Sequence, residues 1–211
     1  MALVGKKFPN ITVDAISFMG DNLRINVLEE AVNNNKKVIL FWYPKDFTFV
    51  CPTELHAFQT ALQEFEQRNT MVIGASCDTN EVHFAWLNTA KNNGGIEGVT
   101  YPLLADTTRN LAAALDILDA EWVYNQEVND EILEGSNVTF RATYLIDETG
   151  KIFHESVNDM PLGRNVNEYL RLIDAYTHVQ TKGEVCPANW EEGKEAMSAD
   201  RNSTAAYLAA N

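Results

Sequence analysis

The clearest pattern in the chain is an unbroken apolar run that gives way to a helical periodicity. Residues 38–42 (VILFW) are all apolar and partly β-branched, which predicts a buried strand. Pro44 ends this strand, because proline has no amide hydrogen to contribute to a sheet. From Pro52 onward, apolar residues recur at steps of three and four, which predicts a helix with one apolar face. That face consists of Leu55, Phe58, Leu62 and Phe65.

The same two patterns alternate along the rest of the chain. The predicted elements are a strand over 71–77, a helix over 80–92, an extended piece over 101–106, a helix over 107–115, a strand over 137–147, a returning strand over 151–157 and a helix over 164–179. Such alternation, with a hairpin near its end, predicts an α/β fold with a mixed central sheet flanked by helices.

The character of the chain changes after Gln180. The remaining residues are mostly polar, include Gly and Pro, and end in a weakly helical piece. We interpret this segment as a C-terminal arm without a core of its own. The predicted division is therefore residues 1–165 for the main domain and 166–211 for the last helix with its arm.

Composition and charge exclude some functions. The chain of 211 residues has a net charge of −14, which argues against non-specific binding to nucleic acid or to an anionic membrane. No apolar stretch approaches the roughly 20 residues that span a bilayer. The first residues do not resemble a signal peptide, so we expect a cytoplasmic protein.

Three cysteines, Cys51, Cys77 and Cys186, are too few for a disulfide scaffold in a chain of this length. An odd number in a reducing compartment indicates thiol chemistry at one or two of them. Cys51 is the strongest candidate because it lies where the first predicted strand passes into the start of a helix. The helix dipole favours a negative sulfur at that position, and the thiolate is the nucleophilic form.

Residues near Cys51 strengthen this interpretation. Thr48 precedes it by three residues, so its hydroxyl can reach the sulfur or an oxygen beside it. The nearest downstream acid is Glu54, one helical turn away. Arg141 lies inside an otherwise apolar predicted strand, where an arginine needs a thiolate or a carboxylate as partner if it is buried.

Each residue also has an ordinary structural interpretation. Cys51 can be a small core residue, and Cys77, at the end of a strand, is best interpreted as structural. Thr48 can simply cap a turn, and Arg141 taken alone is better placed on the solvent face of an edge strand. His56, five residues past Cys51, points to another helix face, which argues against a Cys–His hydrolase.

Two other kinds of site lack support in the sequence. His83, His154 and His178 have no metal-ligand spacing among themselves or with the cysteines, so a zinc site is not expected. The segment NNGGIEG is followed by no Lys–Ser pair and opens no predicted helix, so it is not a phosphate-binding loop.

The segment PKDFTFVCP resembles the peroxidatic loop of the peroxiredoxins, whose signature is Pro, three residues, Thr, two residues, Cys. Here those residues are Pro44, Thr48 and Cys51. Further segments resemble the same family in the same order: HFAWLNT, YPLLAD, FRATYLIDETGKI, VNDMPLGRNVNEYLRLIDAY and KGEVCPANW. The resemblance covers nearly the whole chain and is greatest to the typical two-cysteine subgroup, which includes alkyl hydroperoxide reductase C.

The resemblance implies a thioredoxin-like fold and a role for each matching residue. Cys51 matches the peroxidatic cysteine, which attacks a hydroperoxide and becomes a sulfenic acid. Thr48 and Arg141 match the residues that hold the peroxide and stabilise the transition state. Pro44 matches the residue that shields the sulfur from water.

The resemblance also implies a second group of roles and partners. Glu54 and Arg164 match an outer network that positions the first arginine. Cys186 matches the resolving cysteine, which forms an intersubunit disulfide with Cys51 of another subunit in a homodimer. A ring of dimers, such as a decamer, and a thioredoxin-like or flavoprotein disulfide reductase are implied as well, whereas no metal or organic cofactor is required.

Residues 119–136 form a longer connection than is usual in the family. We interpret them as a surface loop insertion, or alternatively as an altered contact with another subunit or with the reductase.

Two other functions compete with a peroxidase. A protein dithiol–disulfide oxidoreductase would need Cys-x-x-Cys, but the third residue after Cys51 is Glu54. A chaperone-like oligomer with an incidental thiol would keep its protective effect after Cys51→Ser, whereas a peroxidase would lose all peroxide consumption.

Overall fold

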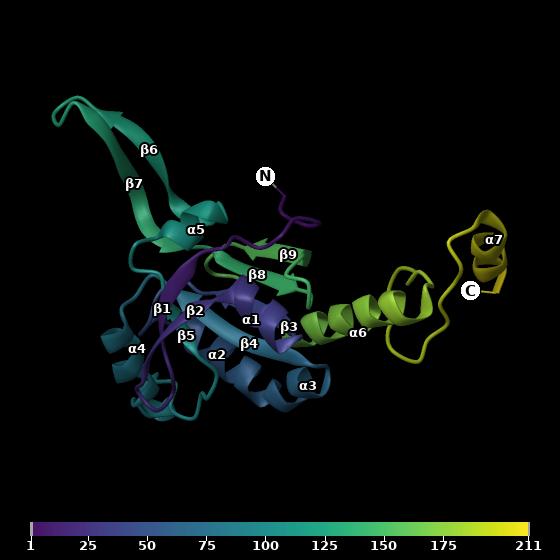
Figure 1. Ribbon diagram of the computed structural model, residues 1–211. Coiled ribbons are helices and arrows are strands. Elements are labelled where there is room, and N and C mark those ends of the chain that lie inside the picture. The colour runs from purple at the N-terminus through teal and green to yellow at the C-terminus, as the bar shows by residue number, and fades with distance from the viewer. Residues whose placement is uncertain (1, 211) are drawn as a thin grey trace. The chain divides into compact units, whose positions relative to one another are not determined.

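A computed structural model describes residues 2–210, which divide into two compact units with the boundary after Arg164. The first unit contains a seven-stranded sheet with strand order β2-β1-β5-β4-β3-β8-β9 and a separate two-stranded sheet, β6-β7 (Figure 1). The strands are β1 Thr12–Ile16, β2 Asn22–Asn26, β3 Lys37–Trp42, β4 Thr70–Ser76, β5 Leu103–Ala105, β6 Leu118–Asn125, β7 Asp130–Thr139, β8 Arg141–Ile146 and β9 Ile152–Asn158.

The helices of the first unit lie between these strands along the chain. They are α1 Val27–Asn34, α2 Cys51–Thr60, α3 Leu62–Gln67, α4 Asn80–Leu87, the 3-10 turn η1 Lys91–Asn93 and α5 Asn110–Ala114. The second unit contains α6 Val166–Lys182 and α7 Arg201–Ala210.

The interior strand β3 shows how the sheet buries both of its faces. It pairs in parallel with β4 and antiparallel with β8, and all six of its residues are buried. Val38, Leu40 and Trp42 belong to one apolar cluster with residues of α1 and α5. Phe41 points to the opposite face, where its ring stacks on Phe58 of α2 at 3.9 Å. This mixed sheet with helices on both faces confirms the predicted α/β architecture.

Several predicted boundaries were wrong. No strand or helix is predicted over residues 12–34, where the structure has β1, β2 and α1. The helix expected from Pro52 is two helices, because Ala61 leaves the helical conformation at φ −88° and ψ 2°. The helix expected over 80–92 ends at Leu87. The chain then turns sharply, and a Cβ on Gly95 would lie 1.9 Å from the carbonyl oxygen of Thr89.

The strand predicted over 137–147 is also divided. It breaks at Phe140, whose amide donates to the carbonyl of Ile117, so that β7 and β8 belong to different sheets. The predicted return of the chain is confirmed, since β8 pairs antiparallel with β9. Consequently β8 lies between β3 and β9 and is not an edge strand.

The long connection over 119–136 is a β-hairpin and not the loop that we expected. Strands β6 and β7 pair from Leu118↔Thr139 to Asn125↔Asp130 and extend away from the rest of the first unit (Figure 1). Trp122 and Tyr124 are 68% and 58% exposed, so the distal part of the hairpin adds no core to the domain. Its structure is defined by pairing between the two strands and not by burial.

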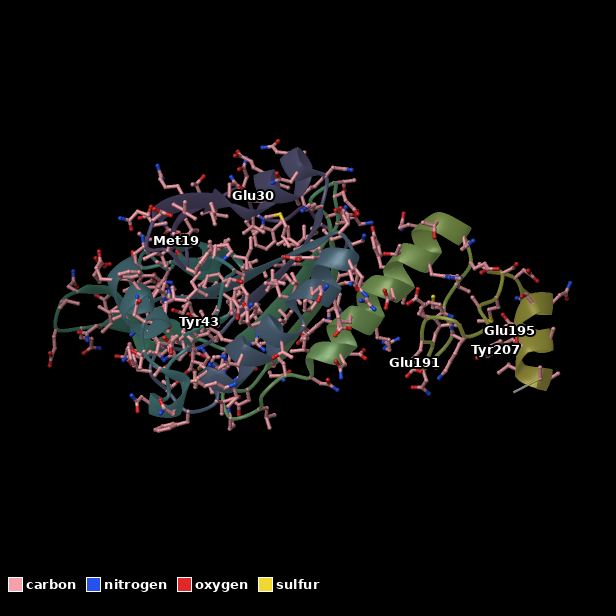
Figure 2. All side chains as sticks on the ribbon, turned by 90° about the horizontal axis from the view of Figure 1, so that it is seen from below. Met19, Glu30, Tyr43, Glu191, Glu195 and Tyr207 are labelled. Atoms are coloured by element: carbon pink, nitrogen blue, oxygen red, sulfur yellow. The ribbon has the colours of Figure 1, made fainter. Side chains whose placement is uncertain are left out.

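The second unit has a small packing centre of its own. Trp190 is 2% exposed, and its ring lies 4.9 Å from that of His178 on α6. Arg171 donates to the carbonyl of Trp190, and Val185 and Met197 exchange backbone hydrogen bonds. These contacts give the predicted C-terminal arm a defined local structure. Figure 2 labels Tyr207 of α7 in this unit.

The exposed hairpin predicts a small effect on stability when it is removed. Replacing residues 121–134 by Asn-Gly retains the Ala120↔Gly135 pair and should change the free energy of unfolding by less than about 1 kcal/mol. Urea unfolding monitored by circular dichroism measures this change. A loss of several kcal/mol would show that the hairpin belongs to the cooperative core.

Candidate active site around Cys51

Cys51 is the first residue of α2 and is fully buried. Pro52 is the second helical residue, one position later than expected. Proline is tolerated at this position, because the first four amides of a helix have no partner within it. Val50 caps the helix only with its carbonyl, which accepts from the amides of Thr53 and Glu54. The sulfur is therefore held at the positive end of a ten-residue helix.

The Thr48 hydroxyl contacts the sulfur, as its spacing suggested. Its Oγ1 lies 2.9 Å from Cys51 Sγ and 2.9 Å from the carbonyl oxygen of Lys45. A hydroxyl has one proton, and both a carbonyl and a thiolate can only accept. Thr48 therefore donates to the sulfur when Cys51 is ionised. When Cys51 is a thiol, Thr48 can donate to Lys45 and accept from the S–H group.

Arg141 reaches the same sulfur from β8. It is 4% exposed, and its Nη1 lies 3.4 Å from Cys51 Sγ. The expectation that Arg141, taken alone, lies on the solvent face of an edge strand was wrong. It is the first residue of an interior strand, and its charge is compensated there. Nη1 also donates to Glu54 at 2.6 Å, and Nε donates to the carbonyl of Met160 at 2.5 Å.

Glu54 joins the two arginines. It lies on α2 one turn after Cys51 and is 3% exposed. Arg164 donates hydrogen bonds to both carboxylate oxygens of Glu54. Its Nε lies 2.8 Å from Oε1, and its Nη2 lies 2.9 Å from Oε2. Such bidentate pairing fixes orientation as well as distance. Burial alone would raise the pKa of Glu54, but hydrogen bonds and charge from Arg164, then Arg141, outweigh it and hold that pKa below its usual value.

Arg164 is anchored to the sheet as well as to Glu54. Its Nη1 donates to the carbonyl of Ala142 and to the hydroxyl of Thr143, and its guanidinium lies 5.2 Å from the centre of the Phe41 ring. The network therefore ties the first turns of α2 to β3 and β8. The position of these side chains therefore depends on how the sheet packs against α2.

The network carries unequal charges. Arg141 and Arg164 contribute two positive charges, and among residues 2–210 Glu54 is the one carboxylate that pairs with either of them. Buried charges are stable only when they are paired. An ionised Cys51 would balance the second guanidinium, because its sulfur lies 3.4 Å from Arg141 Nη1. The site is thus electrostatically suited to a thiolate.

Pro44 is buried and begins the loop that carries Thr48 to the sulfur. At the other end of this loop, Phe49 is 94% exposed. The loop therefore has one face inside the domain and one in solvent, and the half-buried Thr48 lies between the two. Thr48 is therefore partly accessible while Cys51 beside it is covered.

The other two cysteines differ from Cys51. Burial, and next the charge of Asp106, raise the pKa of Cys77 to about 12, so it remains a thiol, in agreement with its structural interpretation. Cys186 lies in the second unit, and its Sγ is 3.6 Å from the carbonyl oxygen of Ala175. Partial burial raises its pKa as well. A raised pKa leaves less of Cys186 as the nucleophilic thiolate at neutral pH.

Other candidate chemistry receives no support. His56 Nε2 lies 3.1 Å from the carbonyl oxygen of Gly95 and not at the sulfur. Among residues 2–210, no group of three His, Cys, Asp or Glu side chains could hold a metal ion. None of the helices in that part of the chain is long and apolar enough to cross a membrane.

Sequence reasoning missed two neighbours of the site. The Met160 carbonyl, which orients Arg141, carries no sequence signal because any residue supplies a carbonyl. Asp46, in the loop before Thr48, is 3% exposed and lies 2.7 Å from buried His83. Asp46 lies between Lys45 and Phe47 in the sequence, and neither neighbour indicates its burial or its partner.

Comparison with known proteins connects this geometry to a family. Residues 4–155 match the model of the AhpC/TSA family, and residues 175–210 match the model of the C-terminal domain of 1-Cys peroxiredoxin. The chain is 40% identical over 210 residues to alkyl hydroperoxide reductase C of Helicobacter pylori, covering 99% of this chain and 98% of that protein. It is 36% identical over 210 residues to the chloroplastic 2-Cys peroxiredoxin BAS1 of Hordeum vulgare, covering 100% of this chain and 92% of that protein.

The solved structures agree with the sequence relatives. The reduced 2-Cys peroxiredoxin of Plasmodium vivax superimposes with a TM-score of 0.87 at 35% identity, over 99% of this chain and 100% of that one. The AhpC of Enterococcus faecalis gives a TM-score of 0.72 at 31% identity, over 89% of this chain and 100% of that one. The predicted thioredoxin-like fold with a mixed central sheet is confirmed.

The lowered pKa of Glu54 predicts how stability depends on pH. Its ion pairs stabilise the folded state above the usual glutamate pKa of 4.5, and this contribution is lost as the pH falls through the lowered folded-state pKa. Glu54→Gln should cost about 3–5 kcal/mol at pH 7, and its stability should decline less on acidification than that of the native chain.

Urea unfolding at a series of pH values measures both effects. Glu64→Gln is the matched control, because Glu64 pairs with Arg68 at 4.0 Å on the surface and should change stability by less than about 0.5 kcal/mol. Equal pH dependence in Glu54→Gln and the native chain would contradict the assigned role of the buried carboxylate.

Proposed function

The chain belongs to the AhpC/TSA family and is a thiol-dependent peroxidase of the peroxiredoxin type, and we propose that Cys51 is the sulfur that attacks the hydroperoxide. The observation that carries this assignment is the convergence of two donors on one buried sulfur. Thr48 Oγ1 and Arg141 Nη1 lie 2.9 Å and 3.4 Å from Cys51 Sγ, and Arg141 is 90 residues away from Cys51 along the chain. Burial raises the pKa of Cys77 to about 12, so Cys77 remains a thiol at neutral pH.

The proposed first step is a displacement on oxygen. The Cys51 thiolate forms an S–O bond with the terminal peroxide oxygen, which keeps its hydrogen, and the O–O bond breaks. The leaving oxygen takes up a proton and departs as water or as an alcohol. The product at Cys51 is a sulfenic acid, the first stage of thiol oxidation. Hydrogen peroxide and alkyl hydroperoxides both fit this scheme.

Thr48 and Arg141 would act on the substrate as well as on the sulfur. Donors that already surround Sγ can bond the two peroxide oxygens and stabilise the charge that develops on the leaving one. Glu54 and Arg164 then act as positioning residues, since they hold Arg141 without contacting the sulfur themselves. Pro44 limits access of water to the loop. This cycle requires no metal or organic cofactor.

The second proposed step regenerates the enzyme through Cys186. Its thiol condenses with the Cys51 sulfenic acid of another subunit, which releases water and forms an intersubunit disulfide. Because Cys51 is fully buried at the start of α2, the first turn of this helix must open before the two sulfurs can meet. Partial burial raises the pKa of Cys186, which favours the less nucleophilic thiol form.

The partners follow from this cycle. The chain acts as a homodimer, assembled further into a ring of dimers, and a thioredoxin-like or flavoprotein disulfide reductase returns the disulfide to two thiols. Among the structural relatives, Prx1a of Plasmodium yoelii, when modified at its N-terminus, forms an artifactual octamer. A reducing compartment such as the cytoplasm supports the recycling.

Substitution of the two cysteines separates the two steps. Cys51→Ser should abolish peroxide consumption. Cys186→Ser should react once with hydrogen peroxide at an unchanged rate but form no covalent dimer. Stopped-flow fluorescence of the reduced protein and non-reducing electrophoresis measure these outcomes. A covalent dimer in Cys186→Ser would implicate Cys77 in place of Cys186, and peroxide turnover by Cys51→Ser would overturn the assignment of Cys51.

Removal of the Thr48 hydroxyl tests the role of the donors. Thr48→Val keeps the shape of the side chain but removes the donor, and should lower the second-order rate constant for hydrogen peroxide by about 10²–10³-fold. Thr48→Ser restores the hydroxyl and should recover most of the rate. Equal rates for the Val and Ser variants would mean that Thr48 only caps the loop.

A further inference from the structure

A buried ion pair holds the loop that precedes Cys51. Asp46 lies in this loop and is 3% exposed, whereas His83 belongs to α4 and is fully buried. His83 Nδ1 lies 2.7 Å from Asp46 Oδ2. The pair joins two parts of the chain 37 residues apart and takes no direct part in the cycle described above. Burying two charged groups costs desolvation free energy, so we ask what this pair does for the loop beside it.

The contacts of His83 determine where its protons lie. Nε2 is 3.1 Å from the carbonyl oxygen of Leu104, which can only accept, so Nε2 carries a hydrogen. Nδ1 and Asp46 then share a second proton, and the pair as a whole is neutral, which suits its burial. Burial alone would lower the pKa of His83, but Asp46 outweighs it and raises that pKa, which favours the imidazolium form.

Two other ionisable groups surround the pair. Tyr43, labelled in Figure 2, follows β3, is fully buried, and has its hydroxyl 3.4 Å from His83 Nδ1. Burial, followed by the charge of Asp46, raises the pKa of Tyr43, so its hydroxyl stays protonated. Asp78, after β4, accepts from the backbone amide of Asp46 at 2.9 Å and from Ser76 Oγ at 2.8 Å. Asp46 is thus held through both its side chain and its backbone.

Helix α4 also contacts the next loop residue. Phe47 has φ 53°, an uncommon conformation for a residue with a large side chain. Its ring lies 5.8 Å from that of Trp86, which is one helical turn after His83. Asp46 and Phe47 immediately precede Thr48. The segment that delivers the Thr48 hydroxyl to the sulfur is therefore held by contacts with α4, in addition to the hydrogen bond of Thr48 to Lys45 within the loop.

We propose that His83 is a positioning residue that controls the balance between the two steps of the cycle. By holding Asp46, it keeps Thr48 against the Cys51 sulfur, and it opposes the opening that exposes Cys51 to Cys186. Loss of the pair slows the reaction with peroxide and speeds disulfide formation. This inference rests on the proposed function, since it concerns the relative rates of its two steps.

The test compares both rates in His83→Gln and the native chain. Reduced protein is mixed with hydrogen peroxide in a stopped-flow instrument, and the oxidation and disulfide phases are resolved by fluorescence. We expect the second-order oxidation rate constant to fall at least about tenfold and the first-order disulfide rate constant to rise at least about threefold. The fraction of Cys51 converted to sulfinic acid by excess peroxide should fall, because the sulfenic acid is resolved sooner.

Two further variants distinguish positioning from general destabilisation. His56→Gln is the matched control, since it also removes an imidazole that contacts a backbone carbonyl but has no contact with the loop, and it should leave both rates unchanged. Asp46→Asn should reproduce the slower oxidation and the faster disulfide formation of His83→Gln. In the double variant, both rate constants should change by no more than they do in either single variant, because the two residues act as one pair.

The outcomes are separable. If the native chain reacts with peroxide and forms the disulfide, but His83→Gln and Asp46→Asn either match it or lose both rates by the same factor, the positioning role is overturned. If His83→Gln does not fold, Asp46→Asn alone gives the same decision. If the native chain itself fails to react with peroxide or to form the Cys51–Cys186 disulfide, the proposed function fails instead.

Discussion

The pairing of one buried carboxylate with two buried guanidiniums is the constraint on which the site depends. Glu54 extends from the same helix as Cys51, Arg141 from the start of β8, and Arg164 from the end of the first unit. Bringing three charges out of water is costly, and only close hydrogen-bonded geometry offsets the cost. The position of Arg141 relative to the sulfur is therefore fixed by the fold as a whole, and the excess positive charge is directed at Cys51.

The same burial creates a requirement for movement. A sulfur that is fully covered in the first turn of a helix is protected and oriented, but it cannot reach a second cysteine without local opening. Elements that move are stabilised by few contacts or by contacts that can be exchanged. The loop before Cys51 has both kinds: an exposed side that contains Phe49, and a buried anchor between Asp46 and α4. Under the proposed positioning role of His83, the strength of that anchor sets how long Thr48 stays against the Cys51 sulfur.

The β6–β7 hairpin projects from the first unit, and only its base lies near the site (Figure 1). Its distal residues are exposed, while its base remains attached to the core through Leu118 and the buried Thr139. Thr139 donates to the carbonyl of Tyr43, which precedes the peroxidatic loop. The addition therefore begins at a buried position close to the loop and extends into solvent.

The sequence alone determined the strand before Cys51, the helix after it, the alternation of an α/β fold and the loop spacing of Pro44, Thr48 and Cys51. These are local properties, because periodicity and capping depend on residues a few positions apart. Only the tertiary structure decided that β8 is an interior strand, that residues 119–136 pair as a hairpin, and that Arg141 and Arg164 share Glu54. It also decided that His83 faces Asp46. Each of these depends on which distant segments pack together, and a polar residue in an apolar segment does not by itself reveal the partner that compensates its burial.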